Sequence, residues 1–183
     1  MSALSGIGLF IVAVLFYLIS LYNRFIRLQN QSEEGWSGIS VQLKRRYDLI
    51  PNLIESVKGY TAYEKSTLDA IIEKRNAAFN AQTPAEKAAA ENSLTQGLKT
   101  LFALSENYPD LKASENFIQL QNSLNTIEDD LQNARRYYNA TVRNLNTAID
   151  AFPSNLIARH FGFEKREFFD IDETEKANVR VQF

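Results

Sequence analysis

One set of charged side chains has the residue types that recognise an anion or a carboxylate. Its members lie on two stretches and are Lys44, Arg45, Arg46, Asp48, Arg135, Arg136, Asn139 and Arg143. Neighbouring arginines present planar forks of N–H donors that match carboxylate and phosphate groups. Two interpretations fit. The set is either an interaction cluster that lines a groove, or a group of ordinary ion pairs beside a helical seam, with Asp48 as the counter-ion of an opposing arginine. The second is favoured, because such pairs are common and individually weak.

Residues suited to catalysis or metal binding do not come together in the sequence. The single histidine is His160, and no acidic residue occupies the apolar stripe of residues 115–152, so a carboxylate-and-histidine metal site lacks its ligands. Ser114 and Ser154 have no histidine at a spacing that suits a serine nucleophile. The chain has no cysteine, which excludes thiolate chemistry and disulfides. We therefore expect no catalytic residue, no metal, no cofactor and no enzymatic activity.

Several aromatic residues are candidate anchors at an interface. They are Trp36, Phe161, Phe163, Phe168 and Phe169. Trp36 suits either a helical core or a contact with a partner. The phenylalanine-rich segment allows three interpretations: it folds over the open end of a helical bundle, rests on a membrane surface, or docks a partner chain. The first is favoured, followed by the membrane.

The element that must position these residues is one long amphipathic helix. Apolar or small residues recur there at alternating steps of three and four, at Phe117, Leu120, Leu124, Ile127, Leu131, Ala134, Tyr138, Thr141, Leu145, Ala148 and Phe152. A stripe of this length must be covered by other helices, because an isolated amphipathic helix cannot bury it. The pattern predicts the principal helix of a bundle.

Three shorter helical patterns precede it. The first runs from Trp36 to Tyr60 and contains Pro51; one kinked helix is favoured over two separate helices because the stripe stays in phase across the proline. The second ends near Asn80. The third begins at Thr83-Pro84-Ala85-Glu86, a capping box with proline at the first helical position. Short connections between four helices predict an antiparallel, up-down-up-down bundle.

The chain begins with a segment that suits a membrane. Met1 to Asn23 carries no charged side chain, and its length approaches the roughly 20 residues that a helix needs to cross a bilayer core. A secretory signal peptide is the alternative, but it requires a basic start and small residues at the cleavage site. We interpret the segment as an uncleaved anchor. Arg24 and Arg27 follow it, which places the C-terminal domain in the cytoplasm and the N-terminus outside; the inverted topology is the alternative.

Composition limits the number of domains and the class of partner. The chain has 183 residues, and its 20 basic and 22 acidic side chains give a net charge of −2, so nucleic acid is not an expected partner. Its 7 glycines and 4 prolines are scattered, and no linker stands out. We predict an all-α protein with an N-terminal transmembrane helix followed by a long antiparallel four-helix bundle. The domains are an anchor (1–23), the bundle (24–160), and a phenylalanine-rich segment with a loosely ordered C-terminal tail (161–183).

Several motifs together resemble the bacterial LemA family. Residues 34–53 read EGWSGISVQLKRRYDLIPNL and are followed by VKGY at 57–60, YPDLKA at 108–113, ARRYYN at 134–139 and FPSN at 152–155. The resemblance extends from the anchor to about Phe169. Departures are small: the family more often has alanine at Gly35, aspartate at Ser40 and histidine at Tyr63. The resemblance implies a single-pass protein of the inner membrane with a helical-bundle domain and no established activity.

These observations favour a non-enzymatic scaffold or adaptor tethered to the membrane. Its expected partners are the lipid bilayer and either further copies of the chain or another membrane-associated protein, because a long seam and a bare apolar anchor both favour lateral contacts. Two alternatives stay open. One is a membrane-surface or lipid-organising protein, and the other is an accessory subunit of a membrane enzyme that uses the arginine–aspartate cluster.

Overall fold

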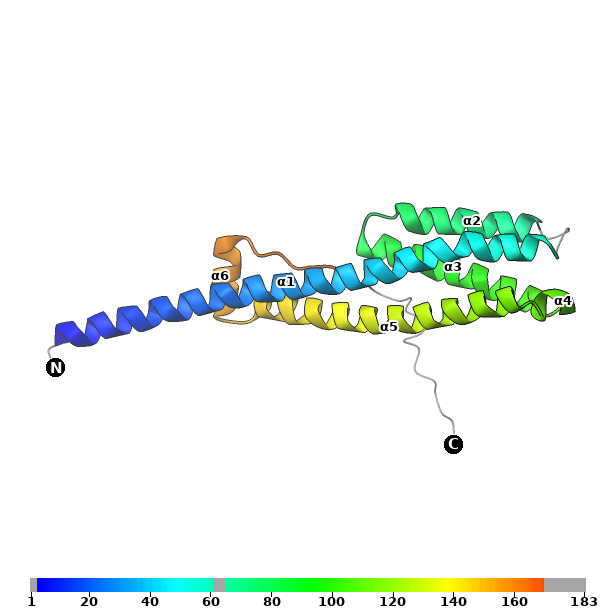
Figure 1. The fold of residues 1–183 in the computed structure, drawn as a ribbon. Coiled ribbons are helices and arrows are strands. Elements are labelled where there is room, and N and C mark those ends of the chain that lie inside the picture. The colour runs from blue at the N-terminus through cyan, green and yellow to red at the C-terminus, as the bar shows by residue number, and fades with distance from the viewer. Residues whose placement is uncertain (1–2, 61–64, 170–183) are drawn as a thin grey trace, which may run out of the picture. The chain divides into compact units, whose positions relative to one another are not determined.

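Helices make up most of the described chain, which comprises residues 3–60 and 65–169, and no strand occurs within those ranges (Figure 1). In this computed structural model the helices are α1 (Ala3–Lys58), α2 (Lys65–Asn80), α3 (Pro84–Ser105), α4 (Pro109–Lys112), α5 (Glu115–Asp150) and α6 (Ser154–Phe161). The all-α prediction is confirmed. The described residues form two compact units: unit 1 contains residues 3–37 and 136–167, and unit 2 contains residues 38–60, 65–135, 168 and 169. The predicted loose tail, from residue 170 on, lies outside the described residues.

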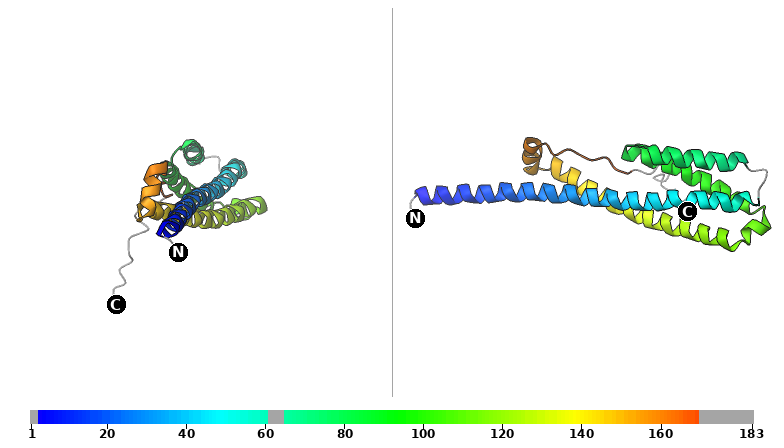
Figure 2. Two further views of the ribbon diagram at one scale, coloured as in Figure 1. Left: turned by 90° about the vertical axis from the view of Figure 1, so that its left-hand side faces the viewer. Right: turned by 45° about the horizontal axis from the view of Figure 1, so that its top comes forward.

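Unit 2 is the four-helix bundle. The second part of α1, α2, α3 and the first part of α5 run in alternating directions, as the two views of Figure 2 also show. Each helix turns an apolar stripe inward, and the fully buried side chains include Ile39, Leu43, Ile50, Leu53, Ile71, Leu94, Leu101, Phe117 and Leu131. α1 continues through Pro51 as one helix, as the unbroken stripe favours. The predicted antiparallel bundle is therefore confirmed.

The start of α3 is fixed by its cap. The Oγ1 of Thr83 accepts a hydrogen bond from the backbone N–H of Glu86 (3.2 Å), and the Glu86 carboxylate accepts from the backbone N–H groups of Thr83 (3.2 Å) and Gln82 (3.1 Å). These bonds to backbone N–H groups lower the pKa of Glu86. The predicted capping box is confirmed, and it sets the register at which α3 enters the bundle.

Removing the cap is expected to weaken unit 2 measurably. Thr83→Ala should lower the free energy of unfolding by about 1 kcal/mol, because the N–H of Glu86 loses its acceptor. Thr83→Ser keeps the hydroxyl and is the matched control. Urea unfolding of the full chain in detergent, followed by circular dichroism, measures both variants. Equal losses in the two variants would contradict the role of the cap.

Unit 1 contains the apolar start of α1, the second part of α5, and α6. One segment of α1 is long and apolar enough to cross a membrane, and its side chains from Ile7 to Ile19 are exposed. Further along, a small core joins Phe25 of α1 to Leu145 and Ala148 of α5 and Ala158 of α6. Gly35 lets α1 and α5 approach closely, since a Cβ there would lie 3.0 Å from the Cα of Tyr138.

The predicted stripe of α5 is buried along most of its length. Phe117, Leu124, Ile127, Leu131, Tyr138, Thr141, Leu145 and Ala148 are buried. Its last predicted position is wrong: α5 ends at Asp150, and Phe152 is 79% exposed. Leu120 and Ala134 are only partly covered.

The part of the phenylalanine-rich segment that belongs to unit 1, up to Glu167, is held by polar contacts. Gly162 ends α6 with a positive φ of 72°, and the chain then turns back along α5. The side chain of Asn146 donates to the carbonyl of Arg166 and accepts from its N–H, both at 2.9 Å. The Tyr138 hydroxyl donates to the carbonyl of Glu167 (2.9 Å). Burial is the main cause that raises the pKa of Tyr138, and the Glu167 charge adds to it against Arg166.

Candidate interaction site

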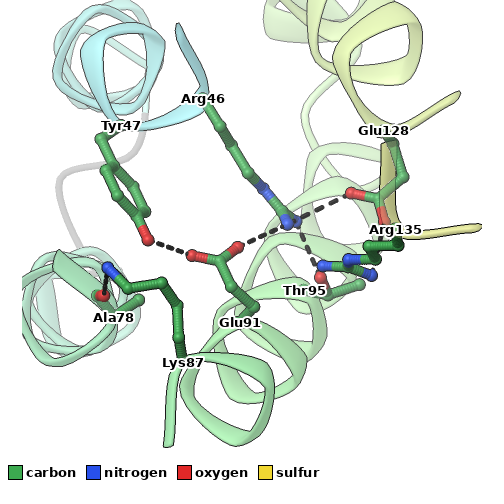
Figure 3. Close-up of polar contacts among 8 residues, drawn as sticks. All are labelled: Arg46, Tyr47, Ala78, Lys87, Glu91, Thr95, Glu128 and Arg135. Carbon is green, nitrogen blue, oxygen red and sulfur yellow. Dashed lines mark hydrogen bonds and ion pairs between the residues drawn. The ribbon is translucent and has the colours of Figure 1, made fainter. Parts of the chain in front are cut away.

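A buried ionic network occupies the centre of the bundle in unit 2. Arg46 of α1 is 3% exposed, and Glu91 of α3 is fully buried (Figure 3). The Arg46 guanidinium lies 2.9 Å from the Glu91 carboxylate and 3.2 Å from that of Glu128 on α5, and it donates to Thr95 Oγ1 at 2.7 Å. Side chains of α3 and α5 therefore both contact one guanidinium of α1.

Two further side chains complete this network. The Tyr47 hydroxyl donates to the second oxygen of Glu91 (Figure 3). Arg135 of α5 is buried, lies 4.0 Å from Glu128, and places its guanidinium 5.0 Å from the centre of the Phe169 ring, a cation–π geometry. Two arginines are thus balanced by two glutamates. The network therefore links α1, α3 and α5, and breaking one of its buried pairs would leave an uncompensated charge.

Tyr47 is held in its neutral form. Its pKa is raised well above its ordinary value, first by burial and then by the charge and hydrogen bond of Glu91, against the opposing effect of Arg46 and Arg135. The folded state therefore favours the protonated phenol. Stability from this residue is complete below the unfolded-state pKa near 10, and it declines as the pH rises above that value.

Tyr47→Phe tests this assignment. At neutral pH the variant should lose about 1–2 kcal/mol, because Glu91 loses a buried donor. The difference in free energy of unfolding between the native chain and the variant should then shrink as the pH rises past about 10, since the phenol ionises there in the unfolded native chain while it stays protonated in the folded one, and the variant has no phenol at this position. Urea titrations over a pH series measure both curves. Curves that stay parallel would show that Tyr47 does not titrate in this way.

The other members of the predicted interaction cluster do not join this network. Lys44 pairs with Asp48 at 2.8 Å on the exposed side of α1, and Arg45 lies 3.3 Å from Asp130. Asp48 therefore pairs with a lysine of its own helix, whereas the sequence interpretation gave it an opposing arginine. Separately, Arg136, Asn139 and Arg143 belong to unit 1, where Arg136 and Arg143 are exposed. Of the eight predicted residues, the buried network contains Arg46 and Arg135.

Sequence reasoning missed the acidic half of the network. Glu91 lies on the buried stripe of α3, between Ala88 and Leu94, and Arg46 lies between Leu43 and Ile50 on the stripe of α1. A charge of opposite sign on each of two facing stripes is a signal for a buried pair. Glu128 gave no such signal, because it lies beside the seam of α5 at a position where charge is ordinary.

An open groove lies between α1 and α5 within unit 2. Two hollows of about 600 and 410 Å³ share Leu49 and Ser123 and so form one depression. Its apolar side chains are Leu49, Leu120 and Ile127, and its walls carry amides, hydroxyls and the Glu55 carboxylate, which pairs with Lys58. The exposed ion-pair residues Arg45 and Asp48 line one of the two hollows. Part of the predicted interaction cluster therefore borders a groove that the described chain leaves open.

The predicted aromatic anchors separate into different environments. Trp36 is partly buried with its ring 5.4 Å from that of Tyr138, and Phe163 stacks on Phe25 at 4.8 Å. Phe169 is buried in unit 2 under Arg135, whereas Phe168 is exposed. Phe161 contacts α1 but remains largely exposed. Phe163 thus packs against α1 and Phe169 against α5.

Comparison with known proteins gives one consistent family. The model of the LemA family matches residues 35–183. Protein LemA of Metamycoplasma hominis is 28% identical over 168 residues, which cover 90% of this chain and 75% of that protein. Magnetosome protein MamQ of Magnetospirillum gryphiswaldense is 25% identical over 195 residues, which cover 92% of this chain and 71% of that protein. These similarities extend over most of the chain, including both units.

Proposed function

The chain belongs to the LemA family, and from that premise we propose that it is a non-enzymatic adaptor, tethered to the membrane, that binds a helix of another membrane-associated protein. The apolar segment of α1 supports the tether. The observation that carries the adaptor role is the groove between α1 and α5, where the seam residue Leu120 is left half covered. This chain leaves part of the apolar stripe of α5 partly exposed, and a partner protein is suited to bury it.

The dimensions and chemistry of the groove suit a helix. On α1 its lining extends from Arg45 to Ser56, which is about three turns or roughly 16 Å. Its apolar centre would receive the apolar stripe of an amphipathic helix, and amides such as Asn52 and Gln119 would meet polar flanks. Because Arg45 and Asp48 already have charged neighbours, the occupant needs no net charge. We therefore assign a neutral amphipathic helix as the occupant.

A different protein fits this groove better than a second copy of the chain. The exposed large apolar side chains of the described bundle helices are scattered, at Val41 on α1, Ile72 and Phe79 on α2, and Ile118 on α5. They form no continuous stripe that could fill the groove of a neighbour. The chain would thus bring another protein to the membrane rather than polymerise through this surface.

The buried network supports a non-enzymatic role. Its charged groups bind one another, and the hollow of about 140 Å³ that Arg46 lines is small, so we assign Arg46 and Glu91 a structural role. The groove is lined by amides, hydroxyls, apolar side chains and ion-paired charges. For the membrane, we propose the bacterial inner membrane, with the N-terminus outside and the bundle in the cytoplasm, because the basic residues follow the apolar segment.

Site-specific crosslinking tests the adaptor role. A photo-crosslinking amino acid replaces Gln119 in the groove of the full chain, in cells, and the matched control carries it at Val41, which is exposed outside the groove. We expect an adduct with one other membrane-associated protein from position 119 and none from position 41. The mapped peptide of the partner should have an amphipathic helical pattern.

Placing a charge in the groove is the second part of the crosslinking test. Leu120→Glu should abolish the adduct from position 119, and Leu49→Glu should do the same from the opposite wall, while circular dichroism verifies that the helices persist. An adduct only with a second copy of the chain, or a partner that is still captured by both glutamate variants, would overturn the proposal. No protein adduct from position 119 would overturn it as well.

A further inference from the structure

The helix α6 and the turn before it expose apolar and basic side chains together. Phe152 is 79% exposed and Leu156 is 57% exposed, and Arg159 and His160 are exposed beside them. The opposite side of α6 is buried, where Ala158 packs into the small core of unit 1. α6 is therefore amphipathic, and its outward face combines large apolar groups with positive charge.

Aromatic contacts fix the level of α6 along α1. The ring of Phe161 lies 4.8 Å from that of Tyr22, and Phe163 lies 5.8 Å from Tyr22 and 4.8 Å from Phe25. The uncharged start of the chain ends at Asn23, between these two positions of α1. Tyr22 and Phe25 are about one helical turn apart, or roughly 4.5 Å. The aromatic end of α6 thus lies at the level where the apolar segment ends.

The direction of α6 suits the surface of a bilayer. α6 crosses the line of α1 at a steep angle (Figure 1). If the start of α1 spans a bilayer, α6 runs along the plane of the bilayer surface. An amphipathic helix in this orientation places its apolar side chains at the boundary between headgroups and acyl chains.

Charges at the same level favour anionic lipid. Arg24 and Arg27 of α1 are exposed, as is Arg159 of α6. The nearby carboxylate of Asp150 pairs with Lys165 at 2.8 Å, so the charge of Asp150 is balanced by Lys165 and not by these arginines. Basic side chains beside a bilayer surface attract anionic headgroups, and tyrosine is typical of the same depth.

We propose that Phe152 and α6 form a lipid-binding foot that inserts Phe152 and Leu156 into the headgroup region of an anionic bilayer, beside the transmembrane segment. The occupant is phospholipid rather than protein, because the exposed face is continuous, through Phe161 and Tyr22, with the segment that enters the membrane. This surface is separate from the groove between α1 and α5, since Phe152 and Leu156 line neither hollow. The foot fixes unit 1 to the bilayer surface, a role that the adaptor function does not require.

Depth measurements on the full chain test the foot. The chain has no cysteine, so Leu156→Cys introduces a single site for a nitroxide spin label. The matched control is Tyr137→Cys, an exposed aromatic position of unit 1 that lies two turns before the α5 residue Leu145 of the small core. In nanodiscs of phosphatidylcholine and phosphatidylglycerol, the ratio of oxygen collisions to collisions with a water-soluble nickel chelate should be several-fold higher at position 156 than at position 137.

Changes of lipid and charge complete the test. The ratio at position 156 should fall at least twofold in nanodiscs of phosphatidylcholine alone, and Arg159→Gln should cause a similar fall in the anionic lipid. A label at position 156 as water-accessible as that at 137 would overturn the proposal. Protection from both oxygen and nickel would also overturn it, since that result means cover by protein. A ratio that is the same in the two lipids would overturn the assignment to anionic lipid.

Discussion

Replacing Glu91 with alanine is expected to lower the free energy of unfolding by about 3–5 kcal/mol. The substitution removes a carboxylate that is fully buried and binds both Arg46 and Tyr47. Arg46 would retain Glu128, but its charge would lose its shortest ionic contact in the middle of the bundle. Urea unfolding of the full chain in detergent, followed by circular dichroism, measures the loss.

Two comparisons make this result specific. Asp48→Ala removes an exposed ion pair with Lys44 and should cost at most about 1 kcal/mol. The triple variant Arg46→Met, Glu91→Leu and Tyr47→Phe replaces the buried pair and the phenol that donates to it by apolar groups, and it should recover most of the stability that Glu91→Ala loses. A loss below about 1 kcal/mol in Glu91→Ala would mean that the network does not hold the three helices together.

Replacing Leu131 with alanine should have the second largest effect, a loss of about 2–5 kcal/mol. Leu131 lies on the stripe of α5 and is fully buried in unit 2. Alanine would leave a cavity that the neighbouring helices can fill only in part. The same urea titration measures the loss in free energy.

Ile118 provides a matched control on the same helix. It is exposed, so Ile118→Ala should change the free energy of unfolding by about 0.5 kcal/mol or less. Both variants introduce alanine into α5. A difference between their losses in free energy therefore reports the burial of the two positions and not the helix propensity of alanine. Similar losses at both positions would show that α5 does not bury the side that its periodicity indicates.

The periodic pattern of apolar residues predicted most of the fold. The stripe of α5, the unbroken pattern across Pro51 and the capping box before Glu86 are each local signals, and each follows from a regular helical geometry. The pattern failed at Phe152, because α5 ends at Asp150 and the next residues form a turn. The end signal is Pro153, because proline disfavours a helical backbone at the residue before it, Phe152, and is typical one to three residues beyond a helix.

Sequence reasoning predicted less of the buried ionic network than of the fold. Arg46 was named in the predicted interaction cluster, but its partners Glu91 and Glu128 lie 45 and 82 residues later in the chain. Which charges face one another depends on the register of three helices, and no local pattern fixes that register. Arg135 and Arg136 are neighbours in sequence, but Arg135 is buried and Arg136 is exposed, a difference that also depends on how α5 packs.

Alkaline carbonate extraction of membranes tests the claim on which the adaptor role and the lipid-binding foot both depend, that the start of α1 crosses a bilayer. We predict that the full chain stays in the membrane pellet, and that Val12→Arg combined with Phe16→Arg moves it to the supernatant, because charge at the centre of a transmembrane helix is strongly unfavourable. Recovery of the native full chain in the supernatant would contradict the claim.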